Sequence, residues 1–196
     1  MKLNILFTAG IFAVAVAMPA AASDSVYTTT LTGPNEAPPN NSPATGSATV
    51  TIDPDLHTMR VQETFSGLTG DTTAAHIHCC TSTPDTGTAM VATTTPTFPH
   101  FPLNVTSGSY DTTFNMTNAS NYNPDFIAAH GGTTSSAFNA LVAGMDNGTA
   151  YSNIHTTVFS SGEIRGFLAP VPEPQTYAML LAGLAVLSVS LRRSRV

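Results

Sequence analysis

The sequence has no tryptophan, two cysteines and a single lysine, Lys2, among 196 residues. Only 9% of its residues are charged, against about 25% in an average soluble domain. Between residues 23 and 170, Arg60 and Arg165 face eleven acidic residues, which gives a net charge of −9. This body lacks the Lys and Arg contacts that bind phosphate backbones, which excludes a nucleic-acid partner. Two cysteines are also too few for a disulfide-framework miniprotein or a Cys-based zinc module.

The N-terminus has the three parts of a secretory signal peptide. Met1-Lys2 is a short basic region, an apolar run extends from Leu3 to Met18, and three alanines follow at residues 20–22. We therefore expect residues 1–22 to be removed by signal peptidase between Ala22 and Ser23. The alternative, an uncleaved anchor, fits less well because a bilayer span needs ~20 apolar residues.

The C-terminus, residues 171–196, is a second three-part signal. Pro172-Glu173-Pro174 is followed by an apolar run from Tyr177 to Leu191 and then by a basic end. These features resemble the PEP-CTERM sorting signal of Gram-negative bacteria. The resemblance implies recognition by an exosortase, cleavage near the motif and delivery to the cell surface or the extracellular matrix. The protein would then contact the membrane only through its C-terminal helix, before processing. The alternative is that this segment is a plain C-terminal anchor.

The body, residues 23–170, shows the alternation and β-branched content of short strands separated by turn residues. This pattern is typical of an all-β sandwich. Two segments break this pattern: Asn123–His130 is expected to form one or two capped helical turns, and Thr134–Met145 has helical spacing, which together predict one or two short inserted helices. Four prolines make Thr81–Pro102 partly an irregular loop. The expected strands are Val26–Leu31, Gly46–Ile52, Met59–Phe65, Ala74–His78, Ala89–Thr93, Ser109–Asn115, Ala150–His155 and Glu163–Leu168.

Three ordered stretches of the body resemble the CHRD domain, which occurs in chordin and in many bacterial secreted proteins. They lie within residues 31–46, 67–78 and 151–166, and together they bracket residues 26–168. The resemblance implies an immunoglobulin-like or superoxide-dismutase-like β-sandwich, and it implies no settled biochemical activity. After His78 this chain departs from the family pattern, because Cys79-Cys80 and a Pro/Thr-rich loop replace a Gly-rich turn.

Three histidines are the candidate metal ligands. His76 and His78 are separated by one residue on an expected strand, so both imidazoles point to one face. His155 ends another expected strand, and if the two strands are neighbours, three nitrogens could converge on Zn²⁺ or Cu²⁺. His-x-His on a strand also resembles copper–zinc superoxide dismutase. In the alternative, the histidines are structural. The candidates for a fourth ligand are His57, His100, His130 and Asp71.

Arg165 is the lone cation near the end of the acidic body, and Glu163 lies two residues before it, on one face of the last expected strand. We expect a structural ion pair between Glu163 and Arg165, with Glu36 and Asp71 as alternative partners. An anion-guiding arginine is the functional alternative. Glu36 itself lies beside Pro38-Pro39, in a sequence that indicates a turn rather than a ligand.

Cys79 and Cys80 are adjacent in an exported chain, where an oxidising environment favours a disulfide between them. Intermolecular bridges or metal thiolates beside His78 are the alternatives. The chain carries no Gly-x-Ser-x-Gly nucleophile elbow.

Two functions remain open from the sequence. The first is a non-enzymatic surface or matrix module that binds a polysaccharide, a protein or a metal. The second is a dismutase-type oxidoreductase using His76, His78 and His155 with Cu or Zn. The acidic body would repel superoxide, which favours the first.

Overall fold

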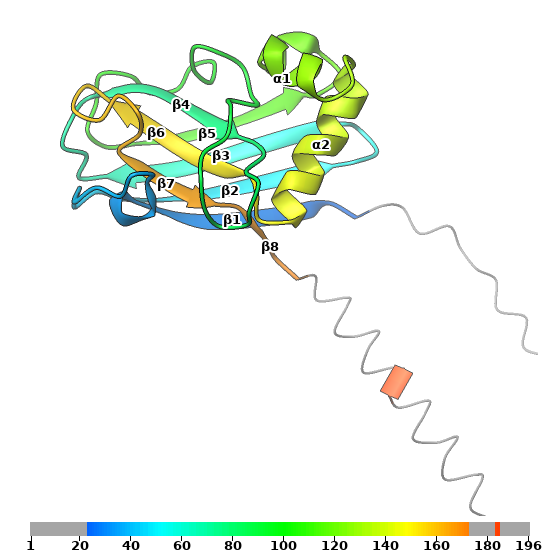
Figure 1. Cartoon of the computed structure of the whole chain (residues 1–196), viewed down its shortest axis with the longest axis horizontal. Coiled ribbons are helices and arrows are strands. Elements are labelled where there is room, and N and C mark those ends of the chain that lie inside the picture. The colour runs from blue at the N-terminus through cyan, green and yellow to red at the C-terminus, as the bar shows by residue number, and fades with distance from the viewer. Residues whose placement is uncertain (1–22, 173–182, 185–196) are drawn as a thin grey trace, which may run out of the picture.

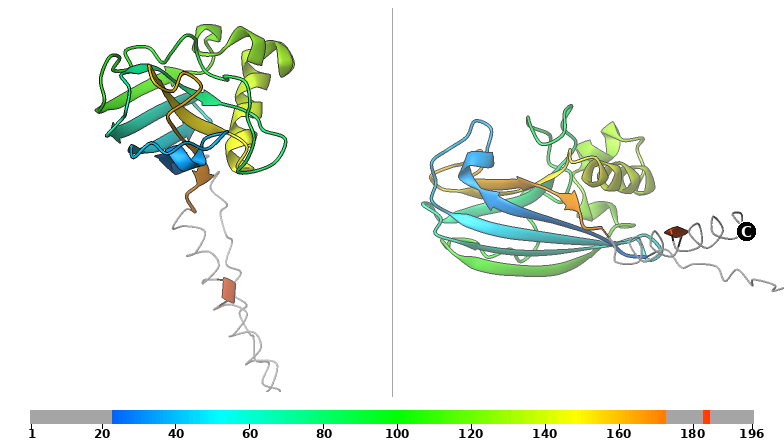
Figure 2. Two further views of the ribbon diagram at one scale, coloured as in Figure 1. Left: turned by 60° about the vertical axis from the view of Figure 1, so that its left-hand side comes forward. Right: turned by 90° about the horizontal axis from the view of Figure 1, so that it is seen from below.

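The computed structural model describes residues 23–172 and residues 183 and 184, and the body is built around one curled antiparallel sheet (Figure 1). The strand order is β4-β6-β7-β1-β2-β3-β5, and β8 pairs with β1 outside this path. Seen from below, the sheet bends around its contents and the helices lie at one end of it (Figure 2). The strands are β1 (Ser25–Thr32), β2 (Thr45–Asp53), β3 (Thr58–Ser66), β4 (Thr72–His78), β5 (Gly108–Asn115), β6 (Tyr151–Thr156), β7 (Ile164–Phe167) and β8 (Ala169–Pro170).

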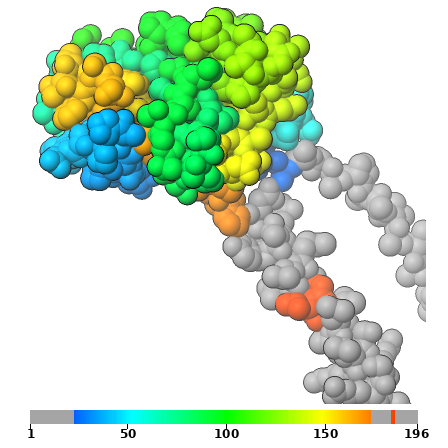
Figure 3. Space-filling view, in the orientation of Figure 1, coloured from blue at the N-terminus to red at the C-terminus, as the bar shows by residue number. Residues whose placement is uncertain are grey.

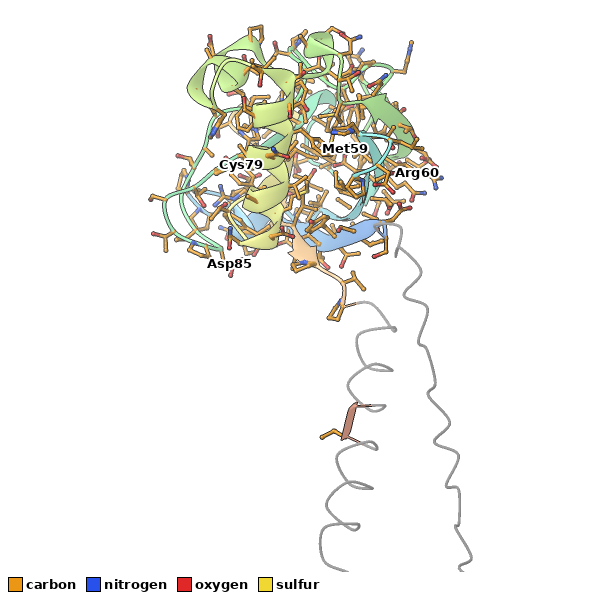
Figure 4. The ribbon with its side chains drawn as sticks, turned by 90° about the vertical axis from the view of Figure 1, so that its right-hand side faces the viewer. Met59, Arg60, Cys79 and Asp85 are labelled. Atoms are coloured by element: carbon orange, nitrogen blue, oxygen red, sulfur yellow. A yellow bond between two sulfur atoms is a disulfide. The ribbon has the colours of Figure 1, made fainter. Side chains whose placement is uncertain are left out.

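Side chains along β2, β3 and β5 alternate strictly between the inner and the outer face of the sheet, and those on the inner face form a large part of the core. Met59 is fully buried whereas its neighbour Arg60 is exposed (Figure 4), because successive side chains point to opposite faces of a strand. The inward faces of β3 and β6 meet across the core, where Ser152 donates a hydrogen bond to Glu63. The sheet thus folds over itself in a sandwich-like manner, which confirms the expected all-β class.

Two α-helices and two single 3₁₀ turns join the strands in the described part of the chain. Asn123 accepts a hydrogen bond from the backbone N–H of Asp125 and caps α1. Thr133 and Ser136 form a reciprocal capping box at the start of α2, and such caps satisfy N–H groups that a helix leaves unpaired. The helical elements are η1 (Gly33–Asn35), η2 (Ala119–Asn121), α1 (Pro124–Ala129) and α2 (Thr134–Asp146).

One expected strand does not form. Ala89–Thr93 makes only isolated bridges, from Val91 to His78 and from Thr93 to Tyr122. Its backbone groups still contact β4, since Ala92 N donates a hydrogen bond to Ile77 O. The segment is therefore a loop held along the edge of β4, and the proline-rich sequence around it prevents a regular ladder.

The two sorting segments are largely outside the described residues. The N-terminal apolar run, the C-terminal apolar run apart from Gly183 and Leu184, the cleavage-site residue Ala22, and Glu173-Pro174 all fall there. Over residues 23–172, 183 and 184, no helix is long and apolar enough to cross a membrane.

Candidate functional site

The three histidines are carried by neighbouring strands. β4 and β6 pair antiparallel, with Ala74 opposite His155 and His76 opposite Asn153. Directly opposed residues share a face, and so do residues two apart, which places His76, His78 and His155 on one side of the sheet. The opposite side of these strands enters the core through Ala75, Ile77 and Ile154.

The imidazoles converge on the side of the sheet that loops cover. Their ligand atoms all lie within 4.8 Å of one another, and their ring centroids are 5.3, 5.8 and 5.8 Å apart. Three points this close lie within about 2.8 Å of a common centre, compared with Zn–N bonds of ~2.0–2.1 Å. Small side-chain rotations would bring all three nitrogens to bonding distance.

Each imidazole is oriented by one backbone carbonyl. His76 Nε2 bonds Pro96 O at 2.6 Å, His78 Nδ1 bonds Ala89 O at 2.9 Å, and His155 Nδ1 bonds Ser160 O at 3.0 Å. A carbonyl only accepts, so each of these nitrogens carries the hydrogen.

The other nitrogen of each ring is consequently a bare acceptor. His76 Nδ1, His78 Nε2 and His155 Nε2 are buried and have no hydrogen-bond partner. Three acceptors cannot satisfy one another, and an unpaired buried polar atom is costly. A cation at their centre would satisfy all three.

The electrostatics keep the rings in their ligating form. Burial lowers the pKa of His76 and of His78 to about 4, and it also lowers the pKa of His155. The neighbouring imidazoles add to the effect on His76 and His78. The three rings are therefore neutral at pH 7, as metal coordination requires.

Of the described histidine, cysteine and acidic residues, none joins these three as a fourth ligand. The candidates His57, His100, His130 and Asp71 all lie outside the cluster. His57 instead packs against Phe138, and His130 against Phe126. Three protein ligands with an open position resemble catalytic more than structural zinc sites.

Tyr151 is a site residue that the sequence reasoning missed. Its ring stacks on His78, with centroids 4.8 Å apart and planes at 4°. Its hydroxyl accepts a hydrogen bond from Ala89 N, in the residue whose carbonyl holds His78. The alternation in Tyr151-Ser152-Asn153-Ile154-His155 could have revealed it, because every second residue shares the face of His155.

Arg165 lies on the same face of the sheet, with its guanidinium 4.7 Å from the ring centroid of Tyr151. It is an ion-pair partner of Glu36, whose Oε2 is 3.8 Å from Arg165 Nε. Arg165 also donates to the carbonyls of Asn35 and Gly87. Burial raises the pKa of Glu36 to about 7, although the charge of Arg165 opposes this shift.

The expected pair between Glu163 and Arg165 is corrected by this arrangement. β7 begins only at Ile164, so the alternation that would place Glu163 beside Arg165 does not reach it. Glu163 turns to other partners and accepts hydrogen bonds from two hydroxyls and two backbone N–H groups, which lower its pKa. The donors are Ser42, Thr156, Thr69 and Gly70.

Cys79 and Cys80 are joined by a disulfide directly after β4, and their peptide bond is cis. The pair lies against α2 (Figure 4), where both sulfur atoms face Gly144. The thiols are thus used in the disulfide, and His78 has no thiolate neighbour from this pair.

Comparison with protein families identifies two segments. A model of the CHRD domain matches residues 27–168, and a model of the PEP-CTERM protein-sorting motif matches residues 170–195. Both resemblances seen in the sequence are confirmed. No curated protein matches the chain, and no solved structure matches it.

Proposed function

The chain belongs to the CHRD domain family, and we propose that it acts outside the cell as a non-enzymatic binding module that holds one transition-metal ion. Its PEP-CTERM motif marks an exported protein that an exosortase processes, and the CHRD domain is not an enzyme family. The proposal adds a final location at the cell surface or in the extracellular matrix, and a polysaccharide or protein partner there.

One observation carries the metal assignment: three neutral imidazoles, two buried and that of His155 half-buried, each have one buried nitrogen without a hydrogen-bond partner, and their ligand atoms all lie within 4.8 Å of one another. Backbone carbonyls hold all three rings, as the outer hydrogen-bond partners of metal-ligating histidines commonly do. Three nitrogen donors suit Cu²⁺ or Zn²⁺. The hard cations Ca²⁺ and Mg²⁺ favour oxygen donors, so they do not fit this set.

The test is the metal content of the mature chain, purified from the periplasm without a His-tag. We expect about one copper or zinc ion per chain, and we expect the His76→Ala/His78→Ala double variant to lose it. His130→Ala removes a histidine outside the cluster and should keep the full metal content. A folded wild-type chain that binds neither metal on titration would make the three histidines structural and refute the assignment.

A dismutase-type oxidoreductase is the second candidate, and the absence of a fourth ligand from the described histidine, cysteine and acidic residues favours it. Against it stands the net charge of −9 between residues 23 and 170, which repels an anionic substrate. The copper-loaded chain would be assayed for superoxide consumption beside the double histidine variant. Turnover that is lost with the histidines would replace the non-enzymatic proposal.

A further inference from the structure

A pocket of about 520 Å³ has Arg165 in its lining. Residues 34–39 form one wall, Asp85 and Thr86 form the other, and Thr29 and Phe167 contribute from β1 and β7. The blue segment around residue 35 and the green loop beside it lie next to each other on the surface (Figure 3). Ligand pockets commonly measure ~300–1,000 Å³, so the volume suits a small ligand.

Arg165 fixes the two walls relative to each other. Its Nε donates to Asn35 O in one wall, and its Nη1 donates to Gly87 O, 2.9 Å away, next to the other. The side chain is only 4% exposed, and that of its ion-pair partner Glu36 is 5% exposed. The pocket is therefore built on two buried charged groups rather than on mobile surface side chains, and it is largely formed before a ligand arrives.

The charges around the pocket disfavour an ionic ligand of either sign. An anion attracted by Arg165 would also meet the carboxyl groups of Glu36 and Asp85, whereas a cation would meet the guanidinium. Hydroxyl groups both donate and accept hydrogen bonds. A neutral ligand rich in hydroxyls can therefore use the carboxyl and the guanidinium groups together.

Part of the lining is apolar. Phe167, Pro38 and Pro39 line the pocket and provide flat surfaces against which the C–H faces of a sugar ring can pack. Polar groups in a small-molecule site fix the orientation of the ligand, and apolar surface beside them contributes contact area.

We propose that this pocket binds one or two sugar units of a neutral extracellular polysaccharide. The inference rests on the extracellular part of the proposed function and is independent of the metal. It assigns the polysaccharide contact to Arg165, Glu36 and the two walls that Arg165 joins.

The experiment titrates the mature chain with neutral tetrasaccharides of β-1,4-glucan, α-1,4-glucan and β-1,4-galactan, and follows binding by calorimetry. A tetrasaccharide of galacturonic acid is the charged comparison. We expect saturable binding of at least one neutral tetrasaccharide and none of the acidic one. Thr86→Trp places an indole in the pocket from its exposed wall. Because the indole occupies the space of the sugar unit, we expect that binding to weaken by about tenfold or more. Thr113→Trp adds the same side chain on the exposed face of β5 and should leave binding unchanged.

The double histidine variant and Thr86→Trp together separate this inference from the metal assignment. His76→Ala/His78→Ala should lose metal and keep saccharide binding, whereas Thr86→Trp should lose saccharide binding and keep metal, which also demonstrates that it folds. Asp85→Asn should weaken binding without changing the shape of the wall. Binding of the acidic tetrasaccharide alone, binding undiminished in Thr86→Trp, or no binding of any neutral tetrasaccharide would overturn the inference.

Discussion

Glu63 is a buried carboxyl group at the centre of the folded sheet. It lies on the inward face of β3 and accepts a hydrogen bond from Ser152 of β6, while its Oε2 has no partner. Burial raises its pKa from 4.5 to about 7. The folded protein therefore holds a proton at Glu63 over a pH range in which the unfolded chain releases it.

This proton makes the free energy of unfolding depend on pH. Between about pH 4.5 and 7 the native state binds more protons at Glu63, so its contribution to stability falls as pH rises and levels off above 7. Glu63→Gln mimics the protonated group and should be about 3 kcal/mol more stable than wild type at pH 8, with little difference near pH 4. Chemical unfolding of both chains across this range measures the difference.

The difference between the two chains is the informative quantity, because the buried histidines titrate as well. Their lowered pKa values act in the opposite sense, so that stability falls as pH drops below about 6.5 in both chains. Asp111→Asn changes an exposed carboxyl group in the Arg60 ion pair. This variant should show no gain in the free energy of unfolding over wild type at pH 8. A constant gap between Glu63→Gln and wild type at every pH would contradict a raised pKa at Glu63.

Tyr151 is expected to position His78 for metal. Tyr151→Phe keeps the stacked ring and removes only the hydroxyl that bonds Ala89 N, which loosens the carbonyl holding His78. Loss of such an outer contact typically weakens metal binding, and we expect about a tenfold higher Kd here. A chelating dye in competition with the chain measures the Kd.

The matched control for this prediction is Tyr27→Phe, which removes a hydroxyl bonded to Asp146, away from the histidines. It should lower stability and leave the metal Kd unchanged. Equal affinities in Tyr151→Phe and wild type would limit Tyr151 to a packing role.

At the scale of elements, α2 and the disulfide are fitted together through one glycine. A Cβ added at Gly144 would overlap the sulfur atoms of both Cys79 and Cys80. The helix therefore approaches the end of β4 as closely as it does because position 144 has no side chain.

Gly144→Ala tests this contact, because helix propensity and overpacking change the free energy of unfolding in opposite directions. Helix propensity alone would make alanine more stable by about 1 kcal/mol, whereas overpacking costs about 1–3 kcal/mol. The close approach of both sulfur atoms places the cost in the upper part of this range, so we expect net destabilisation of up to about 2 kcal/mol in chemical unfolding. Ala143→Gly, at the exposed neighbouring position, measures the propensity alone and should cost about 1 kcal/mol. A more stable Gly144→Ala chain would mean that α2 can move away from the disulfide at little cost.

At the scale of the whole molecule, export depends on residues outside the folded body. Replacing Pro172, Glu173 and Pro174 together by alanine should prevent exosortase processing and leave the chain in the membrane fraction at its unprocessed mass. Fractionation and mass spectrometry of the native host detect this outcome. The adjacent pair Gln175→Ala/Thr176→Ala should be processed normally, and loss of processing in this control as well would assign recognition to a longer segment than the motif.

The sequence by itself determined the features that depend on local periodicity. Alternation located seven of the eight expected strands and placed His76 and His78 on one face. A capped turn at Asn123 located α1, and helical spacing located α2. The PEP-CTERM motif was readable because its parts follow one another along the chain, and the signal peptide expected at residues 1–22 stays a prediction. The strand expected at Ala89–Thr93 does not form, because the proline-rich sequence around it limits its pairing to isolated bridges with His78 and Tyr122.

Only the tertiary structure decided which distant residues meet. His155 joins the other histidines because β6 pairs with β4 in one particular register, and a shift of one residue would turn it to the other face. The backbone carbonyls that orient the three rings come from loops whose paths have no periodic signal. Arg165 pairs with Glu36 rather than Glu163 for the same reason. The sequence shows which acidic residues carry the opposite charge, whereas the packing of strands and loops decides which of them lies close to Arg165.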